Sequence, residues 1–254
     1  MCLQAYTDPG DSVVLFTPVY HAFARVIRAA GRKVVECPLV LEDGRYVMDL
    51  DEYDTLMTGA EKMVILCSPH NPGGRVWSRS ELQAVAGFAE RHDLLLVSDE
   101  IHNDLVMPGY THVPMAVAAP DILNRLVMMS ATTKTFNIAG AHIGNVIVPD
   151  EALRARFGKA MSAMGISPNS FGLVMATAAC SPEGAAWVDE LVQYLDGNRR
   201  LFDEGINAIP GVQSMPMEAT YLGWVDFAGT GMTREEFTRR VEREAKIAVN
   251  HGPT

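Results

Sequence analysis

Short apolar runs rich in valine, isoleucine and leucine alternate with amphipathic runs of helical spacing through the first 148 residues. This alternation predicts a mostly parallel sheet covered by helices on both faces. The apolar runs are nearly continuous, as expected of strands that are buried on both faces. Strands are predicted at Ser12–Thr17, Lys33–Val40, Lys62–Cys67, Leu94–Ser98, Arg125–Ser130 and Ile143–Val148. The predicted fold class is therefore α/β, with three layers in the order helix, sheet, helix.

Between these strands, helical spacing predicts helices at Tyr20–Ala30 and Ser78–His92. Ser78 is a candidate N-cap, and Glu81 three residues later completes a capping box. After Pro149 the pattern changes to helices alone, predicted at Glu151–Ala163, Pro168–Ala179 and Glu183–Ile209. The last of these is long enough to connect two domains.

Beyond the long helix, the pattern predicts a strand at Thr220–Phe227 and a charged helix at Thr233–Ala245, which Thr233 and Glu236 open as a second capping box. We expect a large domain over residues 1–182, then an interdomain helix and an incomplete small α+β domain over residues 183–254. The chain opens inside a predicted helix, Met1–Tyr6, and stops shortly after a predicted helix. Neither end resembles a domain boundary, so we expect a longer protein truncated at both ends.

Composition limits the classes of partner. The formal net charge is −10 and the isoelectric point is near 5.1, which argues against nucleic acid and anionic membranes, because both attract basic surfaces. No apolar run reaches the roughly 18 to 20 residues that cross a bilayer. The four cysteines are scattered without metal-ligand spacing and no secretory signal precedes them. We therefore expect reduced thiols in a cytoplasmic protein.

Three polar segments follow three of the predicted strands. They are Ser68-Pro69-His70-Asn71-Pro72-Gly73-Gly74, Ser98-Asp99-Glu100-Ile101-His102 and Ser130-Ala131-Thr132-Thr133-Lys134-Thr135-Phe136-Asn137. In an open α/β sheet, ligands bind outside the carboxyl ends of the strands. An amide, Asn71, a carboxylate, Asp99, and an amine, Lys134, are thus expected at one edge of the sheet.

Each of these residues also has an ordinary structural explanation. Asn71 before a proline is a common turn residue, Asp99 at a strand end could cap a helix, and Lys134 could lie on the surface. The joint occurrence favours a functional site.

The three groups together match the chemistry of a pyridoxal phosphate (PLP) site. A lysine amine forms a Schiff base with the cofactor aldehyde and, once displaced, is a general base at the substrate α-carbon, which suits Lys134. A carboxylate facing the pyridine nitrogen keeps that nitrogen protonated, which suits Asp99. An amide that donates to the phenolic oxygen tunes the cofactor, which suits Asn71.

The sequence resembles the class I/II aminotransferase family of fold type I PLP enzymes, over essentially all of its length. More narrowly, four motifs resemble the cystathionine β-lyase branch: Thr17-Pro18-Val19-Tyr20, the segments Ser68–Gly74 and Ser98–His102 given above, and Lys134-Thr135-Phe136-Asn137-Ile138-Ala139-Gly140. Glu218-Ala219-Thr220-Tyr221-Leu222 is similar to the return strand of the family's small domain. The resemblance implies that Tyr20 stacks on the cofactor ring, that Asn71, Asp99 and Lys134 bind it as described, and that the protein is a homodimer.

Several positions depart from the family pattern. Typical aminotransferases have a tyrosine three residues after the aspartate. This chain has His102 there, as members of the lyase branch tend to have. His102 could replace the hydrogen bond of the tyrosine phenol, or it could be structural. Ala131 stands where the phosphate-binding hydroxyl is common, so Ser130 or Thr132 is expected to substitute. His142 replaces the family's phosphate-binding arginine.

Two further family features are missing from the chain. The glycine-rich phosphate-binding helix start would precede Met1, and the arginine for the substrate carboxylate would follow Thr254. Arg239, Arg240 and Arg243 do not match the motif of that arginine, and we expect them on a solvated helix face.

These expectations lead to one hypothesis and two alternatives. The first is a PLP-dependent carbon–sulfur β-lyase that cleaves cystathionine-like amino acids to a thiol, pyruvate and ammonia. The second is an aminotransferase that passes an amino group to a 2-oxo acid. The third is a regulatory or inactive fragment that keeps the fold. The expected partners are a small sulfur amino acid and a second copy of the chain.

Overall fold

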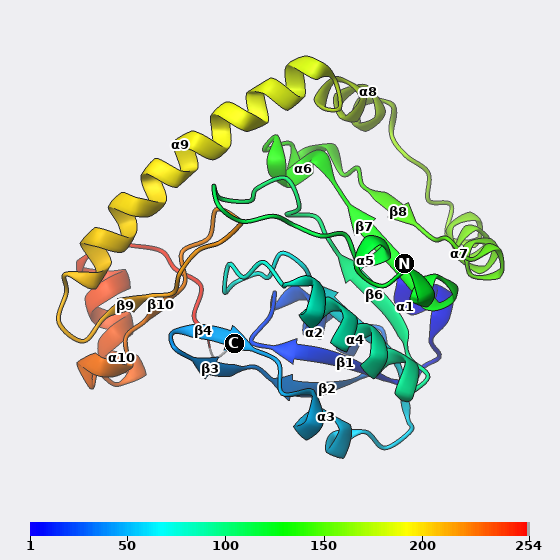
Figure 1. The fold of residues 1–254 in the computed structure, drawn as a ribbon, viewed down its shortest axis with the longest axis horizontal. Helices are drawn as coiled ribbons and strands as arrows, with labels where there is room; N and C mark the ends of the chain where they lie inside the picture. Colours follow the sequence, from blue (N-terminus) through cyan, green and yellow to red (C-terminus); the bar gives the residue numbers. More distant parts are fainter. Residues whose placement is uncertain (253–254) are drawn as a thin grey trace.

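The computed structural model describes residues 1–252, and a six-stranded sheet lies at its centre (Figure 1). The strands are β1 Ser12–Thr17, β2 Lys33–Pro38, β5 Glu61–Cys67, β6 Leu95–Asp99, β7 Leu126–Ser130 and β8 Asn145–Ile147. Their order is β2-β1-β5-β6-β7-β8, and neighbours are parallel except for β7 and β8. All six predicted strands are present, and the prediction of a mostly parallel sheet is confirmed.

Alternating side chains divide the core into two layers, one on each face of the sheet. Val14 and Phe16 of β1 belong to one core, and Val13 and Leu15 belong to the other. The first core includes residues of α3 Leu50–Leu56, α4 Arg79–Arg91 and α5 Met115–Ala118. The second includes residues of α1 Cys2–Tyr6, α2 Ala22–Ala29 and α7 Glu151–Ala163. Helices thus cover both faces, which gives the predicted three layers.

The helix α4 begins as its sequence predicts. Ser78 Oγ accepts a hydrogen bond from Glu81 N (3.2 Å), and Glu81 Oε2 accepts one from Ser78 N (2.7 Å). This reciprocal pair satisfies two amides that the first helical turn leaves unbonded. The short helices α3 and α5 and the 3₁₀ segment Pro120–Arg125 were not predicted.

The sequence analysis extends β2 to Val40, but in the structure β2 ends at Pro38 and a hairpin follows it. β2 ends level with the end of its partner β1, because Leu39 N donates the last hydrogen bond between the two strands to Thr17 O (2.6 Å). Val40 then opens β3 Val40–Glu42, which pairs with β4 Arg45–Val47 as an antiparallel hairpin. The turn passes through Gly44 at φ +74°, a conformation that glycine adopts without a steric penalty.

The segment after β8 is helical as predicted. It contains α7, α8 Ser170–Ala179 and the 26-residue α9 Pro182–Asn207. In Figure 1, α9 runs in yellow along one side of the molecule, from α8 to the small hairpin of β9 and β10. That hairpin pairs β9 Gln213–Ser214 with β10 Val225–Asp226.

The last predicted helix is present in two parts. The short helix α10 Arg234–Phe237 continues as a π-helical segment, η4 Thr238–Glu244. Thr233 Oγ1 accepts from Glu236 N (3.2 Å), and the Glu236 carboxylate lies 2.6 Å from Arg240. One half of the predicted capping box is therefore formed.

The strand predicted at Thr220–Phe227 is wrong over most of its length, since only Val225–Asp226 is β-structure. Thr220 has φ +73°, which an extended strand does not allow. The amides of Ala219 and Thr220 donate to the carbonyls of Gly74 and Leu105, which lie in loops of the large sheet. These bonds replace the pairing that a strand would require.

Among residues 1–252, no helix is both long and apolar enough to cross a bilayer.

The central strand β6 offers a test of the core. Leu96 is fully buried, so Leu96→Ala is expected to lower the free energy of unfolding by about 2–5 kcal/mol through lost packing and the cavity left behind. Leu201 on α9 is 72% exposed, and Leu201→Ala is expected to change it by less than about 0.5 kcal/mol. Urea unfolding of both variants measures the difference, and equal losses would contradict this packing.

Candidate active site

The carboxyl ends of β5, β6 and β7 lie level with one another. Across the sheet, Cys67 pairs with Asp99, and Asp99 pairs with Met129. The segments that carry Asn71, Asp99 and Lys134 therefore leave the sheet from neighbouring positions on one edge. This is the edge at which open α/β sheets bind ligands.

The loop after β5 is bound to its neighbours by backbone hydrogen bonds. Ser68 N donates to Asp99 O (2.9 Å), and His70 N donates to Arg75 O (2.8 Å). Within this loop, Asn71 is half-buried, and its backbone N–H donates to Cys67 Sγ (3.3 Å). The main chain of Asn71 is thus fixed against the end of β5.

Asp99 is buried at the end of β6. Its Oδ1 accepts a hydrogen bond from Ile101 N (3.3 Å). Burial raises the pKa of Asp99 to about 6, because a charged carboxylate loses its hydration, while the Ile101 hydrogen bond and the positive charge of Lys134 act in the opposite direction. At neutral pH the carboxylate is still ionised, close to a cation.

The buried ring of His102 lies one turn beyond Asp99. Burial, and to a smaller extent the positive charge of Lys134, lowers the pKa of His102 to about 4. The ring packs edge-on against Tyr221, with centroids 5.7 Å apart. Within the described residues, neither ring nitrogen has a hydrogen-bond partner. The imidazole is therefore neutral at pH 7 and free to bond a ligand.

Lys134 lies on the short helix α6 Thr132–Thr135, directly after β7. It lines a cavity of about 270 Å³ that is mostly apolar. The apolar side chains around it come from Leu105, Trp187, Leu191, Leu195 and Tyr221. Two residues after Lys134, the ring of Phe136 stacks on Trp187 of α9 at 5.2 Å, which holds the end of α6.

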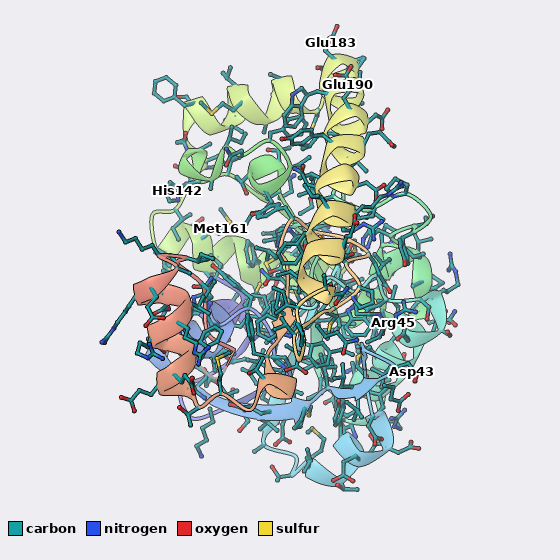
Figure 2. The ribbon with its side chains drawn as sticks, turned by 90° about the vertical axis from the view of Figure 1, so that its left-hand side faces the viewer. Asp43, Arg45, His142, Met161, Glu183 and Glu190 are labelled. Carbon is teal, nitrogen blue, oxygen red and sulfur yellow. The ribbon has the colours of Figure 1, made fainter. Side chains whose placement is uncertain are left out.

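The two candidate phosphate hydroxyls have different surroundings. Thr132 Oγ1 is buried, and in the described part of the chain it has no hydrogen-bond partner. Ser130 Oγ accepts from Asn145 Nδ2 at 3.5 Å and lies on the last residue of β7. Thr132 is therefore better suited to bond an incoming anion. His142 is exposed in a left-handed backbone conformation, at the edge of the molecule in Figure 2.

The structure does not bring every predicted residue into contact with Lys134. Asp99 and His102 both interact with its charge. Tyr20, which follows β1, is 36% exposed and packs edge-on against Phe23 at 5.6 Å. Its predicted stacking on a cofactor ring remains a prediction.

A buried carboxylate that the sequence analysis did not single out supports the turn after β6. Glu100 accepts hydrogen bonds from Ser98 Oγ (2.8 Å) and Met115 N (2.9 Å), and its other oxygen lies 3.0 Å from His112 Nε2. These contacts fix the chain between Asp99 and His102. In the sequence, only the position of Glu100 next to Asp99 indicates that it could belong to the site.

Tyr221 was also missed as a site residue, although it belongs to a motif that the sequence analysis names. No pattern near Tyr221 indicates which residues it contacts, because His102 and Lys134 are far away in the chain.

Comparison with known proteins identifies the family. The model of the family "Aminotransferase class I and II" matches residues 1–254. The chain belongs to this family. Cystathionine beta-lyase PatB of Bacillus subtilis is 35% identical over 254 residues, which is 99% of this chain and 66% of PatB. The chain thus spans about two thirds of the length of the curated relatives it matches.

Solved structures show the same fold. Cystalysin from Treponema denticola, whose crystal structure contains a pyridoxal 5'-phosphate cofactor, is 33% identical with a TM-score of 0.94, over 99% of this chain and 64% of cystalysin. The structure of OvoB is 40% identical with a TM-score of 0.87, over 91% of this chain and 61% of OvoB. The fold is that of the fold type I PLP-dependent transferases, and PLP is the cofactor of the family.

The described residues fit this cofactor. A carboxylate, a lysine and three unbonded polar atoms, both His102 nitrogens and Thr132 Oγ1, occur on two neighbouring segments of one sheet edge. A phosphate ester, a pyridine nitrogen and an aldehyde need an anion-binding hydroxyl, a carboxylate and an amine, and Thr132, Asp99 and Lys134 supply these groups.

The raised pKa of Asp99 predicts a pH-dependent stability. Its pKa rises from 3.8 to about 6 on folding, so the stability that the protonated carboxyl contributes is present below about pH 4 and is lost as the pH rises through 6. Asp99→Asn removes this loss. We compare the unfolding free energy of the cofactor-free variant with that of the unmodified chain. The difference between them, variant minus unmodified, is expected to be about 2–3 kcal/mol larger at pH 7 than at pH 3.5.

Urea unfolding of the cofactor-free chain at both pH values measures this gain. The exposed Asp189→Asn is the matched control, because it removes a carboxylate from the surface of α9. An equal effect of the two substitutions would show that Asp99 is not held in a desolvated site.

Proposed function

We propose that the protein is a PLP-dependent carbon–sulfur β-lyase acting on cystathionine-like amino acids. The net reaction is a thioether of cysteine plus water giving a thiol, pyruvate and ammonia. The observation that carries the proposal is the placement of a buried carboxylate, Asp99, a buried imidazole, His102, and an amine, Lys134, on the two neighbouring segments that leave the carboxyl ends of β6 and β7. The name of the relative PatB, cystathionine beta-lyase, supports the choice of reaction.

Each residue has a defined role in this proposal. Lys134 Nζ binds the cofactor aldehyde and later removes the proton from the substrate α-carbon. Asp99 holds a proton on the pyridine nitrogen, and Asn71 donates to the phenolic oxygen. When bound, PLP supplies the electron sink for the pair left at the α-carbon. The apolar walls of the cavity limit the access of water to the Lys134 amine.

The remaining predicted residues surround the same cofactor. Thr132 binds the phosphate, with Ser130 as the second hydroxyl, and Tyr20 stacks on the pyridine ring. His102 takes the place of the tyrosine typical of aminotransferases, which supports the lyase over amino transfer. An aminotransferase would use the same lysine and carboxylate, so the products distinguish the two reactions.

We also propose two domains, a large domain over residues 1–182 and an interdomain helix with part of a small domain over residues 183–254. The start of α9 at Pro182 supports this boundary. The four cysteines are free thiols, which supports a reducing compartment such as the cytoplasm.

A homodimer completes the proposal. On α8, four large apolar side chains are between 44% and 79% exposed: Phe171, Leu173, Val174 and Met175. Large apolar side chains exposed in this number on one short helix are typical of a surface that a partner covers. The partner that we propose is a second copy of the chain.

Replacement of Lys134 tests the catalytic assignment. With PLP, the unmodified chain is expected to develop a visible absorption band, and borohydride is expected to fix the cofactor covalently to Lys134 by mass spectrometry. Lys134→Ala is expected to lose both and to release thiol from cystathionine at least about 100-fold more slowly, because it lacks the general base. The exposed Lys159→Ala of α7 is the matched control.

The products decide between the alternatives. Equal amounts of thiol and pyruvate support the lyase, whereas a keto acid formed from the donor only when a 2-oxo acid is added indicates an aminotransferase. A cofactor fixed to a lysine other than Lys134 would refute the assignment. Cofactor binding without either set of products would identify a regulatory or inactive chain.

The apolar surface of α8 predicts the effect of a charge on assembly. Val174→Asp is expected to shift the dimer towards monomer by at least about tenfold in dissociation constant, because a carboxylate would be buried without a partner. Val117→Asp on α5, where Val117 is 56% exposed, is the control and should leave assembly unchanged. Sedimentation equilibrium measures both, and a dimer unaffected by Val174→Asp would place the interface elsewhere.

A further inference from the structure

The buried carboxylate of Glu218 connects three parts of the chain that are distant in sequence. Its side chain is 1% exposed. Oε2 accepts a hydrogen bond from Val76 N (2.7 Å) and lies 3.4 Å from Arg75 Nε, both in the loop after β5. Oε1 pairs with Arg45 Nη2 on the β3–β4 hairpin, whose position Figure 2 shows. One carboxylate thus holds a hairpin and a loop of the site together.

The backbone around Glu218 makes a second set of connections. Gly74 O accepts hydrogen bonds from both Glu218 N and Ala219 N (2.9 Å each), and Thr220 N donates to Leu105 O (2.7 Å). Residues 217–222 therefore join the loop after β5 to the loop after β6. We call these six residues the clasp.

Gly74 shows how closely the clasp fits. Gly74 has φ +68°, and a Cβ at this position would lie 3.3 Å from Ala219 O and from Met217 Cα. A side chain here would push the clasp away from the loop. The approach of the two backbones therefore depends on glycine.

The clasp determines where Tyr221 lies. This residue follows Thr220 directly, packs on His102 at 5.7 Å and lines the Lys134 cavity. Thr220 fixes the chain immediately before the ring through its bond to Leu105, and Glu218 fixes it two residues earlier.

The charges around Glu218 make its carboxylate necessary for this fit. Arg75 is 7% exposed in its side chain, and it also pairs with Glu81 at 2.8 Å. Two guanidinium groups, those of Arg45 and Arg75, face Glu218. An amide at position 218 would keep the shape of the side chain but leave this positive charge less compensated, which weakens the clasp.

We propose that Glu218 is a positioning residue of the Lys134 site, which fixes the ring of Tyr221 against His102 through the clasp. The proposal rests on the proposed function, because it takes the cavity beside Lys134 as the active site. Tyr221 then covers His102 from solvent and forms one wall of the pocket that receives the substrate.

The titration of His102 in the cofactor-free chain tests the proposal. Lys134 is the cation that acts on this imidazole, and Tyr221 is the ring packed against it. In Glu218→Gln the ring is expected to leave His102, so that the imidazole regains hydration and its NMR titration midpoint rises by about one unit from about 4 towards its usual range. The spectrum of His102→Gln assigns the resonance.

Asp196→Asn is the matched control. Asp196 is a buried carboxylate that also faces two arginines, Arg199 at 2.7 Å and Arg200 at 2.5 Å, but it lies on α9 outside the clasp. This variant is expected to lose stability in thermal unfolding without moving the His102 midpoint. An unchanged midpoint in folded Glu218→Gln would overturn the proposal and leave Glu218 a structural role.

A milder variant covers the case in which Glu218→Gln does not fold. Arg45→Gln removes one partner of the Glu218 carboxylate, which keeps Arg75 and the Val76 amide as partners, so the buried charge is not left alone. It is expected to raise the His102 midpoint by a smaller amount, and no rise would overturn the proposal. These measurements need no cofactor, so failure of the chain to bind PLP would refute the proposed function and not the positioning role.

Discussion

The level carboxyl ends of β5, β6 and β7 are the constraint on which the site depends. Two apolar cores, one on each face, set this register, because a slip of one residue would turn every buried side chain of a strand to the opposite face. With the register set, Cys67, Asp99 and Met129 lie side by side, and the polar loops begin from adjacent points. The hydrophobic core therefore positions polar groups that it does not contain.

Burial of Asp99 has a cost for the fold and a use for the site. The same loss of hydration that raises its pKa also strengthens its attraction to a nearby cation, since the local dielectric is low. His102 shows the complementary effect, because burial keeps its ring neutral. Strongly perturbed groups of this kind concentrate at functional sites. The apolar burial in the two cores offsets this cost.

Periodicity in the sequence predicts the elements whose partners are local or repeated. The six central strands and α4 follow from apolar runs and from the capping pair of Ser78 and Glu81. The clasp does not follow, because its decisive bond joins Glu218 to Val76, 142 positions away. The candidate site divides in the same way. Asn71, Asp99 and Lys134 are predicted because each lies at or shortly after the end of a strand. Tyr221 and Glu100 act through contacts that no local pattern encodes.

The surroundings of Lys134 come from both parts of the chain. Its own turn is held by the stacking of Phe136 on Trp187 of α9, and Tyr221 reaches the same cavity from the segment beyond α9. The groups proposed for chemistry lie on the rigid edge of the sheet, while much of the cavity wall lies on residues after Pro182. A shift of α9 would therefore change the shape of the cavity, and the sheet register would still hold Asp99 in place. Contacts at the sheet edge thus hold the groups proposed for chemistry, and contacts of the residues after Pro182 shape the cavity. The clasp connects these two sets of contacts.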